Sequence, residues 1–300
     1  MAQVRTNSIN LEYETFGSST FPAILLIPRL GGQLLDWDEF LCEAIAHRGY
    51  FVIRFDNRDS GLSSKIMDPA PGAAAKMFKA LMNGESVTPP YTIQDMAEDA
   101  VGLLDALRIT RAHICGISMG GVIAQTLAIR HSERVQSLIS IYSTTGNPDL
   151  PAPRAEAVKV LFEPAPANRS AYIDYMVDLF KVISGTGIPF DRESHRLLAG
   201  RYFDRSFSPQ GTAHQLIATL MQPNRHSQLA ALTMPALVIH GDDDPLMPLA
   251  AGRETAEAIP NADLVIMQGM GHDLPMMTNS HWAKILEVMV EHMAAHRASR

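Results

Sequence analysis

The sequence predicts an α/β fold: a mostly parallel, eight-stranded sheet flanked by helices, with a helical insertion after the sixth strand. Three observations predict it. Short apolar runs alternate with segments of helical spacing, an order typical of a parallel sheet covered on both faces. The first strand segment, 9–14, instead alternates apolar and polar residues, which indicates a half-buried strand. One long stretch, 146–228, contains helical patterns and no convincing strand.

Each element of the sheet and its covering helices is identified by the period of its apolar residues. After 9–14, continuous apolar runs predict strands at 23–27, 50–55, 112–115, 135–141, 236–240 and 264–267. Apolar residues at helical spacing predict helices at 37–45, 93–107, 122–129, 249–259 and 282–293. Gly49 stops the first of these helices, and Thr92 is placed to cap the second.

Two stretches break this alternation. Residues 66–91 are rich in Pro, Ala and Gly and predict a long excursion with one short helix at 74–81. The longer stretch predicts helices at 155–162, 172–183, 195–201 and 212–221. Helices inserted between two strands indicate a cap over the sheet. We therefore expect a core domain of residues 1–145 and 229–300 and a helical cap domain of residues 146–228.

Composition restricts the class of protein. Of 300 residues, 46% are hydrophobic and 19% charged, the balance of a soluble globular chain. The net charge of −7 argues against a nucleic-acid-binding surface. Two cysteines cannot build a disulfide framework and fit a reducing compartment. No apolar run is long enough to span a membrane, and the N-terminus lacks the apolar region of a signal peptide. We expect a cytoplasmic protein; its oligomeric state stays open.

The strongest chemical signal lies at Ser118. Gly116-Ile-Ser118-Met-Gly120 stands between a buried strand and an apolar helix. That context is the one a nucleophile elbow requires, a sharp turn that small neighbours permit and that presents the serine at the sheet edge. The helix that follows points free N–H groups at the reacting atoms. The alternative, a serine in an ordinary strand–helix turn, is the weaker interpretation.

A serine nucleophile needs a base and a group that orients the base. Only His272, within Gly269-Met-Gly-His272, lies in a glycine-flanked loop after the last predicted strand. Most other histidines are expected to be structural. His131, His281, His292 and His296 fall on predicted helices, and His113 and His240 lie in or beside predicted strands. We therefore expect His272 to be the base.

Three carboxylates follow the strand at 236–240, and one of them can hold the histidine in the required tautomer. These residues are Asp242, Asp243 and Asp244. They do not form a calcium loop, because no glycine occupies the sixth position and the twelfth is Arg253. We expect neither a metal nor a cofactor.

The chain resembles the α/β-hydrolase-fold serine esterases over essentially its whole length. Within that superfamily it is similar to the aclacinomycin methylesterase-like branch. The segments that carry the resemblance are Phe55-Asp-Asn-Arg-Asp-Ser-Gly61, Gly116-Ile-Ser-Met-Gly120, Gly241-Asp-Asp-Asp-Pro245, Gly269-Met-Gly-His272 and, in the cap, Ser184-Gly-Thr-Gly-Ile-Pro-Phe190. The family's acid follows Gly-x-x, which implies Asp244, and the order Ser118, Asp244, His272 is the family's order. Asp242 and Asp243 are then expected to be solvated turn formers.

The chain departs from that family after the third predicted strand. Relatives commonly carry His-Gly there, whereas this chain reads Ile27-Pro-Arg29-Leu30-Gly-Gly. Backbone donation needs no particular side chain, so the N–H groups of Leu30 and Met119 are expected to form the oxyanion hole. Arg29 has two interpretations: it binds a substrate carboxylate, or it points away into an ion pair behind the site. We favour the second.

These observations predict a cofactor-independent carboxylic ester hydrolase for small to medium apolar esters, with a small-molecule ester as its partner. Candidate pocket residues are Arg29, Met247, Phe180 and Met221. Serine rather than aspartate as nucleophile argues against epoxide hydrolases and haloalkane dehalogenases. Proline iminopeptidases, perhydrolases and carbon–carbon bond hydrolases use the same Ser–Asp–His set and stay open. An alternative from another class is a small-molecule binding protein on this fold that turns over slowly.

Overall fold

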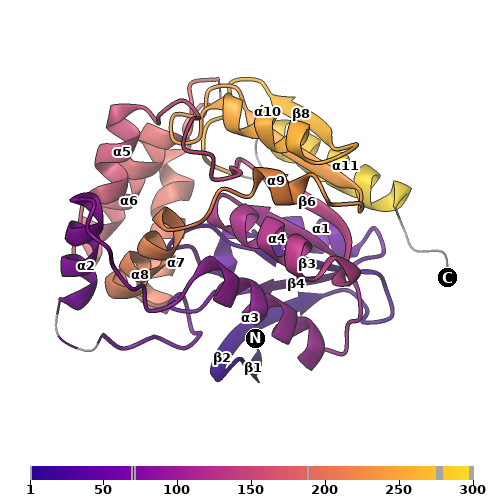
Figure 1. Ribbon diagram of the computed structural model, residues 1–300, viewed down its shortest axis with the longest axis horizontal. Helices are drawn as coiled ribbons and strands as arrows, with labels where there is room; N and C mark the ends of the chain where they lie inside the picture. Colours follow the sequence, from indigo (N-terminus) through magenta and orange to yellow (C-terminus); the bar gives the residue numbers. More distant parts are fainter. Residues whose placement is uncertain (1, 69, 71, 188, 275–279, 297–300) are drawn as a thin grey trace.

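A computed structural model describes residues 2–68, 70, 72–187, 189–274 and 280–296. Among them, eight strands form one sheet in the order β1-β2-β4-β3-β5-β6-β7-β8 (Figure 1). β2 is antiparallel to its neighbours β1 and β4, and all other pairs are parallel. The strands are β1 (Ala2–Thr6), β2 (Ile9–Phe16), β3 (Ala23–Ile27), β4 (Phe51–Phe55), β5 (Ala112–Ile117), β6 (Val135–Ile141), β7 (Ala236–Gly241) and β8 (Asp263–Met267). The predicted fold class is confirmed.

Of these strands, the sequence pattern did not reveal β1. It is an edge strand that pairs only with β2, and its side chains are mostly exposed, so it lacks an apolar run. Asn7 and Ser8 join the two strands with positive φ angles of 47° and 66°. Two residues of positive φ form the tight hairpin turn whose twist matches the flanking strands.

Helices cover both faces of the sheet. α3 (Ile93–Ala106) and α4 (Met119–Arg130) pack on one face, and α1 (Glu39–Ala46) and α11 (Ser280–Ala295) pack on the other. Thr92 caps α3 as predicted, in a reciprocal pair of hydrogen bonds with Asp95. α10 (Leu249–Ala258) packs beside β7 and β8, and short 3₁₀ turns occupy Leu34–Asp36 and Ser132–Arg134. Within the described part of the chain, no helix has the length and apolarity needed to cross a membrane.

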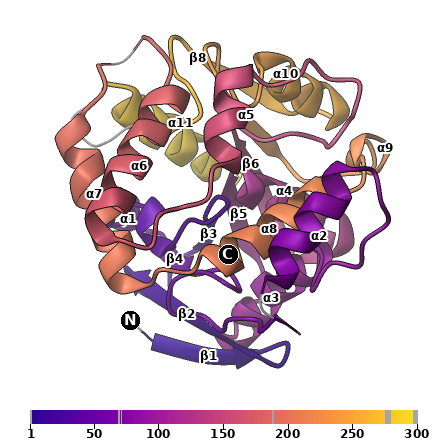
Figure 2. The same ribbon diagram turned by 90° about the vertical axis from the view of Figure 1, so that its left-hand side faces the viewer.

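Among the described residues between β6 and β7 there are five helices, and the first four lie at the edge of the sheet where the parallel strands end (Figures 1 and 2). The five are α5 (Ala155–Phe162), α6 (Arg169–Ile183), α7 (Arg192–Arg205), α8 (Pro209–Leu220) and the short α9 (His226–Leu229). Hydrogen bonds from α7, from α8 and from the chain after α6 reach the loops that follow β3, β4, β7 and β8. The insertion therefore covers the carboxyl edge of the sheet, where the elbow serine emerges.

Two helices pack across the boundaries expected between the core domain and the cap domain. α2 (Ala73–Met82), expected within the core domain, packs against α8, and its Phe78 ring lies 5.2 Å from that of Phe162 on α5. α9 spans the predicted boundary at 228 and packs against α4 and α10 of the core. Arg225, just before α9, is buried and donates to Gln125 on α4. The side of the boundary on which each helix packs depends on its tertiary contacts and not on its position along the chain.

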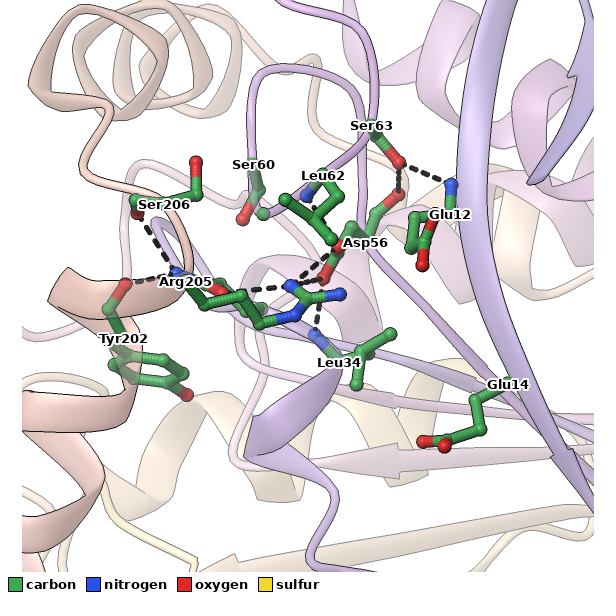
Figure 3. Close-up of polar contacts among 12 residues, drawn as sticks. Glu12, Glu14, Leu34, Asp56, Ser60, Leu62, Ser63, Tyr202, Arg205 and Ser206 are labelled. Carbon is green, nitrogen blue, oxygen red and sulfur yellow. Dashed lines mark hydrogen bonds and ion pairs between the residues drawn. The ribbon is translucent and has the colours of Figure 1, made fainter. Parts of the chain in front are cut away.

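A buried ion pair connects the insertion to the core. Figure 3 shows Arg205, at the end of α7, reaching Asp56 just after β4. The guanidinium and the carboxylate are 2.7 Å apart. The Asp56 carboxylate also accepts hydrogen bonds from the backbone of Leu34 (2.7 Å) and Leu62 (2.8 Å). Its charge is thus fully hydrogen-bonded, which a buried carboxylate requires. Removing one partner alone would leave the other charge buried and unpaired.

A second buried connection passes through His214 on α8. Both ring nitrogens face carboxylates, Nδ1 that of Asp59 at 3.0 Å and Nε2 that of Asp68 at 2.8 Å, and the side chain is fully buried. Burial lowers the pKa of His214, but the hydrogen bonds to both carboxylates outweigh it and raise the pKa above 6.5. His214 therefore bridges the insertion and two core loops, and the two carboxylates favour its imidazolium form.

This raised pKa predicts a pH-dependent stability. A histidine whose folded pKa exceeds its unfolded pKa contributes stability that is complete below the unfolded pKa, here 6.5, and is lost as pH rises through the folded value. We expect the difference in unfolding free energy between wild type and His214→Gln to shrink above pH 6.5. Urea unfolding across pH measures it, with the exposed His226→Gln as control. A difference independent of pH would contradict the bridging imidazolium.

Candidate active site

Ser118 occupies a strained turn between β5 and α4. Its φ of 53° and ψ of −120° are unfavourable for a residue with a side chain, and such strain collects at functional sites. The neighbouring glycines leave no room for side chains. A Cβ on Gly116 would lie 2.0 Å from the Gly120 carbonyl oxygen, and one on Gly120 would lie 2.2 Å from the Ile27 oxygen. The Gly-x-Ser-x-Gly pattern therefore follows from the close packing of this turn.

The structure brings Ser118, His272 and Asp244 together from three separate segments. His272 Nε2 lies 2.8 Å from Ser118 Oγ, and His272 Nδ1 lies 2.7 Å from Asp244 Oδ2. The Asp244 carboxylate is fully buried and His272 nearly so, whereas Ser118 is half-buried. The other Asp244 oxygen accepts from the backbone of Leu246 (2.8 Å) and Met247 (2.7 Å). These bonds fix the carboxylate beneath the imidazole.

Two further side chains surround this constellation. The Tyr142 ring packs against His272 with 4.7 Å between centroids, directly after β6 and at a positive φ of 35°. His240 lies 3.7 Å from Asp244, but its Nε2 instead donates to the Met247 carbonyl at 2.7 Å. Burial lowers the pKa of His240 and keeps it neutral, although the charge of Asp244 acts in the opposite direction. Asp244 therefore forms its side-chain hydrogen bond with His272 and not with His240.

The backbone around the predicted oxyanion hole leaves two donors unoccupied. Within the described residues, neither Leu30 nor Met119 donates its backbone N–H to a protein acceptor. Their neighbours do donate: Arg29 N–H to Asp36, and Gly31 N–H to Gln215 on α8 at 2.8 Å. Met119 begins α4, where the first backbone N–H groups lack helical acceptors. Free donors at these positions are what an oxyanion hole requires.

The structure places Arg29 in an ion pair, which is the second of the two interpretations given above. Its guanidinium forms an ion pair with the buried Asp36 at 2.9 Å, also donates to the Tyr202 hydroxyl, and lies 4.6 Å above the Phe180 ring. Burial lowers the pKa of Arg29, but the charge of Asp36 outweighs it and the net shift is upward. Arg29 is thus held between the loop after β3 and helices α6 and α7, behind the site.

The expectation that Asp242 and Asp243 are solvated turn formers is wrong for Asp243. Its carboxylate pairs with Arg154 at 2.7 Å and accepts both the N–H and the hydroxyl of Thr186, each at 2.7 Å. These hydrogen bonds lower the pKa of Asp243. Arg154 and Thr186 both lie in the inserted stretch, so Asp243 connects the insertion to the loop of Asp244. Asp242 is exposed and accepts from the Gly269 N–H at 2.6 Å.

The candidate pocket residues are spread more widely than the triad. Met247 adjoins Asp244, and Phe180 is buried between Arg29 and the ring of His195. Met221 is 37% exposed at the end of α8, away from that cluster. A hollow between insertion and core is lined by residues such as Gly31, Gln33, Tyr172, Phe207 and Thr212, but Ser118 does not line it. That these side chains bind substrate stays a prediction.

Sequence reasoning missed the residues that support the site from the insertion, such as Gln215 and His195. Each is one polar residue on an amphipathic helix, and no local signal distinguishes it. Tyr142 was detectable, because it directly follows a strand at the sheet edge that carries Ser118. Among the described residues, no group of three or more His, Cys, Asp or Glu side chains is arranged to hold a metal ion.

Comparisons with known proteins identify the family of the fold. The model of the alpha/beta hydrolase fold family matches residues 22–276. Rhodomycin D methylesterase DauP of Streptomyces sp. (strain C5) is 30% identical, over 91% of this chain and 92% of its own. 3-Oxoadipate enol-lactonase 2 of Acinetobacter baylyi is 29% identical, over 87% and 85%. The crystal structure of the enol-lactonase from Burkholderia xenovorans LB400 superposes with a TM-score of 0.73 at 25% identity, covering 98% and 100%.

Proposed function

The chain belongs to the alpha/beta hydrolase fold family, and we propose that it is a serine carboxylic ester hydrolase with the triad Ser118, His272 and Asp244. One observation carries the proposal: the continuous hydrogen-bonded chain from Ser118 Oγ through His272 to the buried Asp244, at the elbow. A serine hydroxyl becomes an effective nucleophile only beside such an oriented base.

In the proposed mechanism, Ser118 Oγ attacks the ester carbonyl carbon while His272 Nε2 takes the hydroxyl proton. Asp244 holds the Nδ1–H tautomer and stabilises the imidazolium. The N–H groups of Leu30 and Met119 bind the carbonyl oxygen as it becomes an oxyanion, at about 3 kcal/mol per donor. The alcohol leaves with the proton from His272. Water, deprotonated by His272, then releases the acid from the acyl-enzyme.

We propose residues 146–228 as a cap whose inner face binds small to medium apolar esters. An apolar cluster of Ala157, Phe180, Ile183 and Leu246 lies between the insertion and the loop of Asp244, which favours apolar ligands. The relatives named a methylesterase and an enol-lactonase also act on esters, since a lactone is a cyclic ester. Cys42 and Cys115 are free and buried, which supports our proposal of a reducing, cytoplasmic setting.

A substrate screen tests this proposal. We expect hydrolysis of p-nitrophenyl acyl esters and of methyl esters, with short and medium acyl chains favoured over charged ones, and little activity on aminoacyl amides. The measurement is the initial rate across the panel, with enzyme-free buffer as the blank for non-enzymatic hydrolysis and Ser118→Ala as the variant without the proposed nucleophile. Preference for aminoacyl amides would indicate a proline iminopeptidase-like enzyme instead. Turnover equal to the blank would favour the binding-protein alternative.

A further inference from the structure

The loop that carries His272 is bound directly by the inserted chain after α6. Three backbone hydrogen bonds join them: His272 N–H to the Ile183 oxygen (2.6 Å), Gly271 N–H to the Ser184 oxygen (3.0 Å) and Gly187 N–H to the Gly269 oxygen (3.0 Å). One of these bonds is made by His272 itself. The backbone position of the proposed base therefore depends on the insertion as well as on the core.

Glycines allow the two segments to approach so closely. A Cβ on Gly185 would lie 2.6 Å from the Gly271 nitrogen, and one on Gly187 would lie 2.3 Å from the Gly269 Cα. Gly185 and Gly269 also have positive φ angles of 82° and 71°, which favour glycine. The two backbones are thus in direct contact, with no side chain between them to absorb a displacement.

The next residue, Asp273, extends this contact. Its Oδ2 accepts a hydrogen bond from the Ser184 hydroxyl at 3.0 Å and lies 2.9 Å from His195 Nε2 on α7. The carboxylate is 11% exposed and the histidine side chain 5%. A largely buried carboxylate is thus satisfied mainly by the insertion, one residue away from His272.

The surroundings of His195 favour its imidazolium form. Its Nδ1 donates to the Asp191 carbonyl at 2.6 Å while Nε2 faces Asp273, so both ring nitrogens face acceptors. The rings of Phe190 (4.4 Å) and Phe180 (4.9 Å) cover its faces. Burial lowers the pKa of His195, and so does the positive charge of Arg29, but the hydrogen bond to Asp273 and its charge outweigh both and raise the pKa.

We propose that two parts of the insertion, Ile183–Gly187 and His195, position His272 for catalysis, and that the His195–Asp273 ion pair holds the His272 loop in place. His195 and Asp273 are positioning residues, because they act through the His272 loop and do not touch the reacting atoms. This inference rests on the proposed function and deepens it. When His195 loses its proton, the ion pair is lost and His272 is held less accurately. The reactivity of Ser118 then falls.

A fluorophosphonate probe tests this without requiring a known substrate. Ser118 Oγ forms a bond to phosphorus and fluoride leaves, while His272 accepts the serine proton, so the labelling rate reports the serine–histidine pair. The rate constant is measured against pH for wild type, His195→Gln and the matched control His226→Gln on the exposed α9 surface. Thermal unfolding verifies that each variant is folded.

In the wild type and in His226→Gln, we expect labelling to fall at high pH as His195 deprotonates. His195→Gln should lose the fall at high pH and label on the order of tenfold more slowly at neutral pH, because small errors in position are costly. Should His195→Gln fail to fold, Asp273→Asn replaces it. Removing the carboxylate abolishes the ion pair at every pH, so Asp273→Asn should also lose the fall and label slowly at neutral pH.

A fall at high pH that His195→Gln retains would overturn the positioning role, even if the rate drops equally at every pH. A wild type without such a fall, or an Asp273→Asn variant that retains it, would overturn it as well. Failure of the proposed function is distinguishable, because the wild type would then not be labelled at Ser118 at any pH. Labelling of Ser118 with an unaltered pH profile in His195→Gln removes only the positioning role.

Discussion

Ser118→Ala should leave a folded protein whose ester hydrolysis is reduced by at least ~10³-fold, as expected when a triad loses its nucleophile. The oxyanion donors and the pocket remain in this variant, so some rate above the uncatalysed reaction should persist. The hydroxyl donates only within the site, to His272, and its removal adds no bulk to the strained turn. Stability should therefore change little, and kcat with the best ester of the panel measures the loss.

The matched control for this prediction is Ser227→Ala, which removes an exposed hydroxyl from α9. It should hydrolyse esters at the wild-type rate. Near-wild-type turnover in purified Ser118→Ala would refute the assignment of the nucleophile, provided that Ser227→Ala and the wild type are equally active.

Asp244→Asn should reduce kcat by about 10⁴-fold, the loss seen when a triad carboxylate becomes an amide. The amide oxygen can still accept from Leu246 and Met247, so the loop keeps two of its hydrogen bonds. The amide nitrogen then faces His272 Nδ1, where two donors would meet. The imidazole is driven into the wrong tautomer, with its Nε2 protonated and unable to accept the proton of Ser118.

The two neighbouring carboxylates provide the controls. Asp242→Asn should leave the rate nearly unchanged, because Asp242 is exposed and only supports the turn at Gly269. Asp243→Asn should have a mild effect on kcat and lower the stability, because it weakens the connection to Arg154 and Thr186. If either variant were the costly one and Asp244→Asn were mild, the assignment of the acid would be wrong.

The sequence was most informative where the required signal is local. Ser118 could be identified because the glycine pattern, the strand before it and the helix after it are contiguous. His272 stood out because it follows the last strand within a run of glycines. Parallel strands deliver their loops to one edge, so these residues and Asp244 were expected to meet there. The distances among them follow from the sheet order, which periodicity alone does not determine.

What could not be predicted involves contacts between the insertion and the core. Asp243 was expected to be solvated, because nothing in its neighbourhood reveals that Arg154 and Thr186 fold onto it. The membership of α2 and α9 likewise depends on which helix each packs against. The edge strand β1 was missed for the opposite reason, since exposed residues produce no apolar pattern. Local patterns predict elements, whereas pairing between distant segments needs the folded chain.

The central claim is that Ser118 becomes covalently acylated during turnover. The most direct measurement is mass spectrometry of enzyme quenched in acid within the first turnovers of a p-nitrophenyl ester, followed by peptide mapping. We predict one added acyl group, carried by the peptide that contains Ser118, together with a burst of p-nitrophenol of about one equivalent when deacylation is rate-limiting. The adduct should accumulate further in enzyme quenched from a slowly deacylating ester. An acyl group on another residue, or turnover of the slowly deacylating ester without any adduct on Ser118, would contradict the account.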